Sequence, residues 1–125
     1  MNSQMYETTL RKNAELRSTH SGAGAWIVQR ITAILLIGAI GWVLIALMTG
    51  RMDTYDAFQS WSTDPWNKAF LLVLMAVLSI HTALGLKVVV EDYIHKIVPK
   101  ISLICLIYFG CVGLFLLAFV AIVSF

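Results

Sequence analysis

Long stretches without a charged side chain dominate this sequence. Between Arg30 and Arg51 lie 20 such residues, between Lys68 and Lys87 lie 18, and residues 101–125 add 25 more. A helix needs about 20 apolar residues to cross the hydrocarbon core of a bilayer. The stretches lack the polar stripe of a helix in a soluble bundle, and 59% of the chain is hydrophobic. The sequence therefore predicts an all-α membrane protein with three transmembrane helices, at about 26–49, 68–90 and 101–125.

The first 25 residues differ from the rest of the chain in being polar. They predict an N-terminal tail of residues 1–25, followed by a membrane anchor of residues 26–125. No apolar core follows Met1, so a cleaved secretory signal is not expected. A short amphipathic turn is expected around Tyr6–Leu16. The segment Ser18–Gly24, which is rich in small and polar residues, is expected to be a flexible lead-in.

Positive charge is distributed unevenly between the two sides of this three-helix arrangement. Seven of the nine Lys and Arg residues fall in 1–30 or 87–100, and two fall in 51–68. Because loops rich in Lys and Arg stay inside, the N-terminus is expected inside and the C-terminus outside. The membrane would be the bacterial inner membrane or the mitochondrial inner membrane. The net charge of +2 is then a consequence of topology, and no nucleic-acid partner is predicted.

The motifs of soluble enzymes are absent from the sequence. Cys105 and Cys111 are six positions apart, which on a helix is about 240° of rotation, so they are not expected to form a disulfide. The sequence has no paired-cysteine metal motif and no glycine-rich phosphate loop after a strand. The chain is therefore expected to contribute to chemistry through the membrane segment itself.

His81 lies inside the second apolar stretch, past its midpoint. An ionisable residue at that depth is costly and suggests a function, although a neutral imidazole that hydrogen-bonds a neighbouring helix would also explain it. Gly85 lies one turn further along the same helix face and removes bulk beside the ring. The small residues Ala69, Ala76, Ser79 and Ala83 gather on the opposite face, where another helix can pack closely. Ligation of haem b through His81 is the sharper hypothesis.

A second axial ligand is not expected from this chain. His95 is fourteen residues after His81, or about 21 Å along a helix, and His20 lies in the tail. A six-coordinate haem would therefore take its other ligand from another subunit. The chain is expected to be one part of an assembly.

Asp92 and Tyr93 follow His81 by eleven and twelve residues. On a continuous helix Asp92 is about 20° from the azimuth of His81 and about 16 Å away. A phenol at a boundary between lipid and water can donate a hydrogen bond to a quinone carbonyl. The alternative is that Asp92 and Tyr93 belong to a solvated helix end, with Tyr93 in the interfacial aromatic belt.

Two stretches together resemble a known family. One is QRITAI, from Gln29 to Ile34, at the start of the first span. The other is the mid-helix His81 with Asp92 and Tyr93 after it, H-x10-D-Y. With the three-span layout, these motifs resemble the smaller hydrophobic membrane anchor subunit of succinate dehydrogenase, respiratory complex II. The resemblance covers about residues 18–125.

The resemblance implies specific roles for four residues. His81 would be one axial ligand of the haem b iron, and Arg30 would lie near the haem propionates. Tyr93 would hydrogen-bond a ubiquinone carbonyl, with Asp92 beside it. The implied partners are a larger cytochrome b anchor subunit, which supplies the other haem ligand, an iron–sulfur subunit and a flavoprotein subunit. Alone, Arg30 is equally explained as a charge that flanks a span and sets topology.

Three functions remain open on the sequence. The leading one is a membrane anchor of a succinate:quinone oxidoreductase that helps bind haem b and form the quinone site, without being the catalytic core. The second is the anchor of a fumarate reductase or another quinone oxidoreductase. The third is a cofactor-free membrane adaptor, in which His81 only makes a hydrogen bond between helices.

Overall fold

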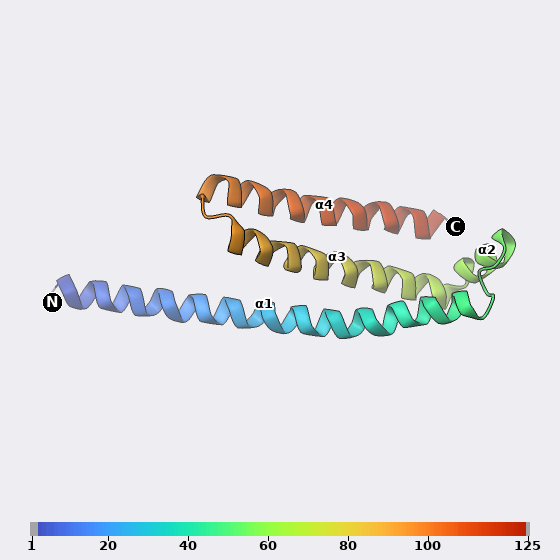
Figure 1. Ribbon diagram of the computed structural model, residues 1–125, viewed down its shortest axis with the longest axis horizontal. Coiled ribbons are helices and arrows are strands. Elements are labelled where there is room, and N and C mark those ends of the chain that lie inside the picture. Colours follow the sequence, from blue (N-terminus) through green and yellow to red (C-terminus); the bar gives the residue numbers. More distant parts are fainter. Residues whose placement is uncertain (1–2, 125) are drawn as a thin grey trace.

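A computed structural model describes the backbone of residues 3–124 and the side chains of that part except residues 3, 6 and 13–21. Within it the chain forms four helices and no strand (Figure 1). Three of them contain segments long and apolar enough to cross a membrane, Gly22–Met48, Pro65–Tyr93 and Ile97–Ser124. The predicted all-α fold with three membrane helices is confirmed. The helices are α1 (Ser3–Met48), α2 (Tyr55–Thr63), α3 (Pro65–Tyr93) and α4 (Ile97–Ser124).

The three long helices run antiparallel in chain order, with α3 between α1 and α4 (Figure 1). The α3–α4 connection lies at the end of the bundle past which the N-terminal part of α1 extends, and α2 and the C-terminus lie at the other end. Residues 1–30 and 87–100, the two regions with most Lys and Arg residues, therefore lie toward the same side of the bundle. This arrangement agrees with the predicted inside position of the N-terminus, which stays a prediction.

Helix α1 is longer than the sequence indicated. The expected flexible lead-in at Ser18–Gly24 is wrong, because α1 is continuous from Ser3 to Met48, and the turn expected at Tyr6–Leu16 is part of this longer helix. The segment contains no proline, and a glycine inside a helix costs only about 1 kcal/mol relative to alanine. Such a cost does not stop a helix that continues into a membrane span.

The ends of the helices follow from local chemistry. Asp64 caps α3, where its side chain accepts hydrogen bonds from the backbone N–H groups of Trp66 and Asn67, and Pro65 occupies the first turn, where no N–H is needed. Gly50, with φ of 71°, follows the end of α1 in the left-handed conformation that favours glycine. The connection between the spans also holds α2, which the sequence analysis did not predict.

The small-residue face of α3 packs against α4, as predicted. Ala83 is only 4% exposed. Ala76, Ser79 and Ala83 line an apolar cavity of about 310 Å³ together with residues of α4 that include Cys111. Ala69, expected in the same group, is exposed instead. Both cysteines are free, as predicted.

The opposite face of α3 packs against α1. The rings of Trp42 and Phe70 are 5.6 Å apart between centroids near the end of the bundle that carries α2. Thr32 and Leu36 of α1 are buried further along, at 6% and 7% exposure. Most other large apolar side chains of the described region are exposed, as expected for a chain that is surrounded by lipid and other subunits.

Candidate functional site

A cleft of about 810 Å³ lies between α1 and α3. Its volume is within the range of about 300–1,000 Å³ that is usual for ligand sites. It has apolar walls with a few polar and charged side chains, and it contains two of the predicted site residues, Arg30 and His81. From α1 it is lined by Gly22, Ala25, Trp26, Gln29, Arg30 and Ala33, and from α3 by His81, Leu84, Gly85, Lys87, Val88 and Glu91.

His81 is half-buried at the wall of this cleft. Its Nδ1 is 2.9 Å from Oγ1 of Thr32 on α1. The imidazole thus makes the interhelical hydrogen bond that one interpretation of the sequence expected. That bond occupies one of the two ring nitrogens, and among the side chains that the structure describes Nε2 has no hydrogen-bond partner. A hydrogen bond to a neighbouring helix through Nδ1 and a ligand bound through Nε2 are therefore compatible.

Gly85 lies on the cleft face of α3, one turn from His81, as predicted. The space beside this glycine is occupied in part by a side chain of α1. A Cβ atom at position 85 would come 3.2 Å from Nε2 of Gln29. The Oε1 atom of the same Gln29 amide is buried without a hydrogen-bond partner in the described structure. Because buried polar atoms are nearly always paired, an unpaired acceptor in the cleft wall suggests that another molecule completes this surface.

Two cationic side chains line the cleft. The Arg30 guanidinium lies 5.3 Å from the centroid of the Trp26 ring, within the distance of a cation–π contact. Lys87 of α3 is the second cation, and its Nζ is 3.7 Å from Oε1 of Glu91. The cleft therefore combines an imidazole, an aromatic wall and positive charge near its edge, which suits a flat apolar ligand with acidic substituents.

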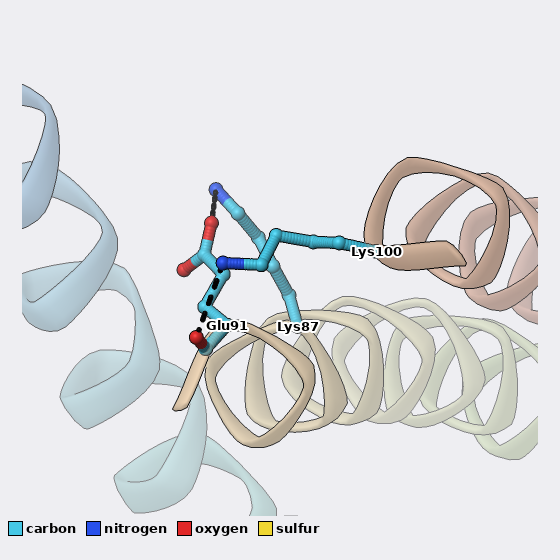
Figure 2. Close-up of polar contacts among 3 residues, drawn as sticks. All are labelled: Lys87, Glu91 and Lys100. Carbon is cyan, nitrogen blue, oxygen red and sulfur yellow. Dashed lines mark hydrogen bonds and ion pairs between the residues drawn. The ribbon is translucent and has the colours of Figure 1, made fainter. Parts of the chain in front are cut away.

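Basic side chains hold the C-terminal end of α3 (Figure 2). Figure 2 shows Lys87 and Lys100 converging on Glu91, the first through its carboxylate and the second through its backbone carbonyl at 3.3 Å. The last carbonyls of a helix lack intrahelical partners, and cations are favourable there. Because Lys100 comes from α4, this contact ties the two helices together beside Asp92 and Tyr93. The ion pair, 33% and 45% exposed, stabilises the helix by only about 0.3–0.5 kcal/mol.

Asp92 and Tyr93 are the last two residues of α3. The helix is continuous from His81 to this point, so the predicted relation of about 20° and about 16 Å holds. Both side chains are exposed, Tyr93 at 81%, and neither lines the cleft. The structure thus brings His81 and Arg30 together and leaves Asp92 and Tyr93 on a separate surface at the end of the same helix.

Residues 4–124 match the family described as the succinate dehydrogenase/fumarate reductase transmembrane subunit. The chain belongs to this family. A succinate dehydrogenase hydrophobic membrane anchor subunit of Rickettsia typhi is 26% identical over 120 residues, which are 96% of this chain and 95% of the relative. The protein of the same name from Rickettsia conorii is 31% identical over 98 residues, 76% of each chain. That from Rickettsia bellii is 34% identical over 77 residues, 62% of each.

As a transmembrane subunit of this family, the chain is a multi-pass protein of the bacterial inner membrane and serves as the membrane anchor of a succinate:quinone oxidoreductase. It is a non-catalytic part of an enzyme complex, in association with other subunits. The resemblance that the sequence motifs indicated is therefore confirmed. The roles of the individual residues were inferred from those motifs and are not tested by the family match.

Several residues of the cleft were not singled out from the sequence of this transmembrane subunit. Thr32 and Gln29 belong to the same six-residue stretch as Arg30, yet their partners on α3 depend on how the two helices are aligned. Lys87 and Glu91 looked like ordinary charges at a membrane boundary. Their spacing of four residues was the available sign that they could pair.

Proposed function

We propose that this transmembrane subunit, together with a larger cytochrome b anchor subunit, binds haem b and builds the site where ubiquinone is reduced. The single observation that supports this most is the position of His81, half-buried in the wall of a cleft between α1 and α3 that also carries Arg30. An iron–sulfur subunit would deliver electrons to this membrane part. Succinate would be oxidised on a flavoprotein subunit.

The residues of the cleft fit a haem. A haem needs from the protein only axial ligands to its iron, so a single histidine of this chain is enough for its part of the site. His81 would supply one ligand through Nε2, and a histidine of the larger anchor would supply the other. Arg30 and Lys87 would pair with the propionates. When bound, the group supplies one-electron redox chemistry; the role of this chain is to hold it, orient it and exclude water from it.

The quinone site would lie at the end of α3. Tyr93 ends that helix with its side chain 81% exposed, so its hydroxyl is accessible to a quinone or to another subunit. In the proposed site this hydroxyl donates a hydrogen bond to a quinone carbonyl. Asp92 lies beside it and would adjust the charge of the site, paired with an arginine of the larger anchor. Partner subunits would close the site on the exposed side.

A cofactor-free membrane adaptor is the second candidate, and one observation favours it. The hydrogen bond of 2.9 Å between His81 and Thr32 already gives the imidazole a structural partner. This candidate gives no reason for the unpaired amide oxygen of Gln29 in the wall of the cleft. The direction of the reaction is a separate question, because the family name covers both succinate dehydrogenase and fumarate reductase.

The test is a reduced-minus-oxidised absorption spectrum of the purified complex, with and without His81→Phe. We expect a b-type signal from the parental complex and a lost or shifted signal from the variant. His95→Phe is the matched control, because His95 is an exposed histidine outside the cleft, with Nδ1 3.3 Å from the backbone oxygen of Tyr93. A parental complex without a b-type signal would favour the adaptor. An unchanged spectrum and midpoint potential in His81→Phe would show that His81 is not a ligand.

A further inference from the structure

We propose that the hydroxyl of Thr32 positions His81 by accepting a hydrogen bond from Nδ1–H, so that Nε2 is left as the nitrogen that binds iron. The inference rests on the proposed haem-binding function and adds a residue of α1 to it. Neither the sequence motifs nor the family match assigns a role to Thr32. Three observations support it: the direction of the hydrogen bonds, the burial of the pair and a comparison with a second threonine of the same region.

The direction of the hydrogen bond follows from the number of protons on the hydroxyl. Oγ1 of Thr32 is 2.9 Å from the backbone oxygen of Val28 and 3.1 Å from that of Gln29. A hydroxyl carries one proton and two acceptor lone pairs, and a helical threonine commonly uses that proton to bond a carbonyl oxygen of the preceding turn. The contact of 2.9 Å to Nδ1 of His81 therefore uses a lone pair of Oγ1. In this arrangement the ring nitrogen is the donor, which places the proton of a neutral imidazole on Nδ1.

Burial makes this hydrogen bond hard to replace with water. Thr32 is 6% exposed, and the bond joins α1 to α3 inside the apolar part of the bundle. The side chain of a threonine has restricted χ1 freedom in a helix, where it bonds to the preceding turn. The acceptor is thus fixed in place by α1 itself. Removing it would leave the N–H of the half-buried His81 facing the buried position of Thr32 without a partner, at a cost in free energy.

A second threonine shows what the interhelical bond adds. Thr49, just after α1, has the same pair of bonds to its own chain, with Oγ1 2.7 Å from the backbone oxygen of Ile45 and 3.3 Å from that of Ala46. In the described structure it has no imidazole partner. Bonding to the preceding turn is a general habit of helical threonines, whereas the bond to a ring nitrogen distinguishes Thr32. Thr49 is therefore the matched control position.

The expected consequence is a change in both haem affinity and redox potential. A hydrogen bond from the non-ligating nitrogen orients a metal-bound imidazole and raises its basicity, and loss of such a partner typically weakens metal binding or activity about 10- to 100-fold. A more basic ligand stabilises the oxidised iron. Thr32→Val, which keeps the shape and removes the acceptor, should therefore raise the midpoint potential of haem b and weaken haem retention by about 10- to 100-fold.

The experiment uses the complete complex, purified with Thr32→Val, Thr32→Ser or Thr49→Val. Haem content per complex and the midpoint potential from a redox titration are measured, together with the visible spectrum. We expect Thr32→Val to show the higher potential and the lower haem retention, Thr32→Ser to restore both because it keeps the hydroxyl, and Thr49→Val to match the parent. A purely structural role of Thr32 would alter the yield of complex without shifting the potential of the haem that remains.

Two results would overturn the inference. One is an unchanged potential and haem content in Thr32→Val, while His81→Phe still loses the haem signal; the proposed function would then stand and the role of Thr32 would not. The other is an equal loss in Thr32→Val and Thr32→Ser, which would show that haem content and potential do not follow the presence of the hydroxyl. A parental complex without a b-type signal would instead refute the haem-binding function on which this inference depends.

Discussion

Replacing Tyr93 with phenylalanine removes one oxygen atom from the last residue of α3 and keeps the aromatic ring. The side chain is 81% exposed, and its hydroxyl has no hydrogen-bond partner among the described residues. The contact that position 93 does make uses the backbone, whose oxygen is 3.3 Å from Nδ1 of His95, and a phenylalanine keeps it. The substitution should therefore change the stability of this chain by less than about 0.5 kcal/mol.

The effect on the quinone reaction is expected to be much larger than the effect on stability. If the hydroxyl of Tyr93 donates to a quinone carbonyl in a site closed by other subunits, its loss leaves that carbonyl without a partner, at a cost of about 1–3 kcal/mol. Such a cost corresponds to a decrease of roughly 5- to 150-fold in the rate of quinone reduction. If the hydroxyl also bonds the quinone before the reaction, in the ground state, part of this loss would appear as a raised KM for quinone.

The assay compares two electron acceptors in the same purified complex. Succinate-dependent quinone reduction should decrease in Tyr93→Phe, while succinate oxidation with an artificial acceptor that bypasses the membrane site should stay at the parental rate. Tyr108→Phe is the control, because Tyr108 of α4 lines the separate apolar cavity. Parental quinone reduction in Tyr93→Phe would refute the reasoning and leave Tyr93 as an interfacial aromatic residue.

Two further predictions concern topology and the cleft. Single cysteines that replace Thr8 and Thr63, in a background without the two native cysteines, should react with a membrane-impermeant label from opposite sides of the membrane; reaction from one side would contradict the three-span topology. Gly85→Leu should lower the haem content of the complex, because even a Cβ atom at this position comes 3.2 Å from Nε2 of Gln29 and a longer side chain fills the cleft. Gly38→Leu is the control and should retain haem, because a Cβ atom at Gly38 would meet nothing within 4 Å. Parental haem content in both variants would show that the haem does not lie beside Gly85.

The membrane helices could be predicted because they depend on composition alone. Uncharged stretches of sufficient length have few alternatives to a spanning helix, and the azimuth of Asp92 relative to His81 needs only a continuous helix. The helical lead-in at Ser18–Gly24 was missed because glycine and serine lower helix propensity by amounts that a long neighbouring helix overcomes. Helix α2 was missed because its nine residues are fewer than a helix usually needs to be recognised by its periodicity.

The contacts between helices could not be predicted in the same way. That Thr32 meets His81, and that Gln29 fills the space beside Gly85, depends on the alignment of α1 with α3. A single sequence gives the periodicity of each helix but not the axial position of one helix relative to another. The small-residue face of α3 was predictable because Ala76, Ser79 and Ala83 share one azimuth, although their partner on α4 was not.

The unbroken course of α3 from Pro65 to Tyr93 has a consequence for how such a subunit can change over evolution. His81 and Tyr93 are fixed on one rigid rod, so their separation is set by residue count and not by side-chain packing. Inserting or deleting one residue between them would rotate one end by about 100° relative to the other. Substitutions between the two positions leave the length of the rod unchanged, and those at positions that line the cleft, such as Gly85 and Lys87, act on the cleft alone. Change of length is better tolerated before Pro65 or after Tyr93, in the connections at either end of the helix.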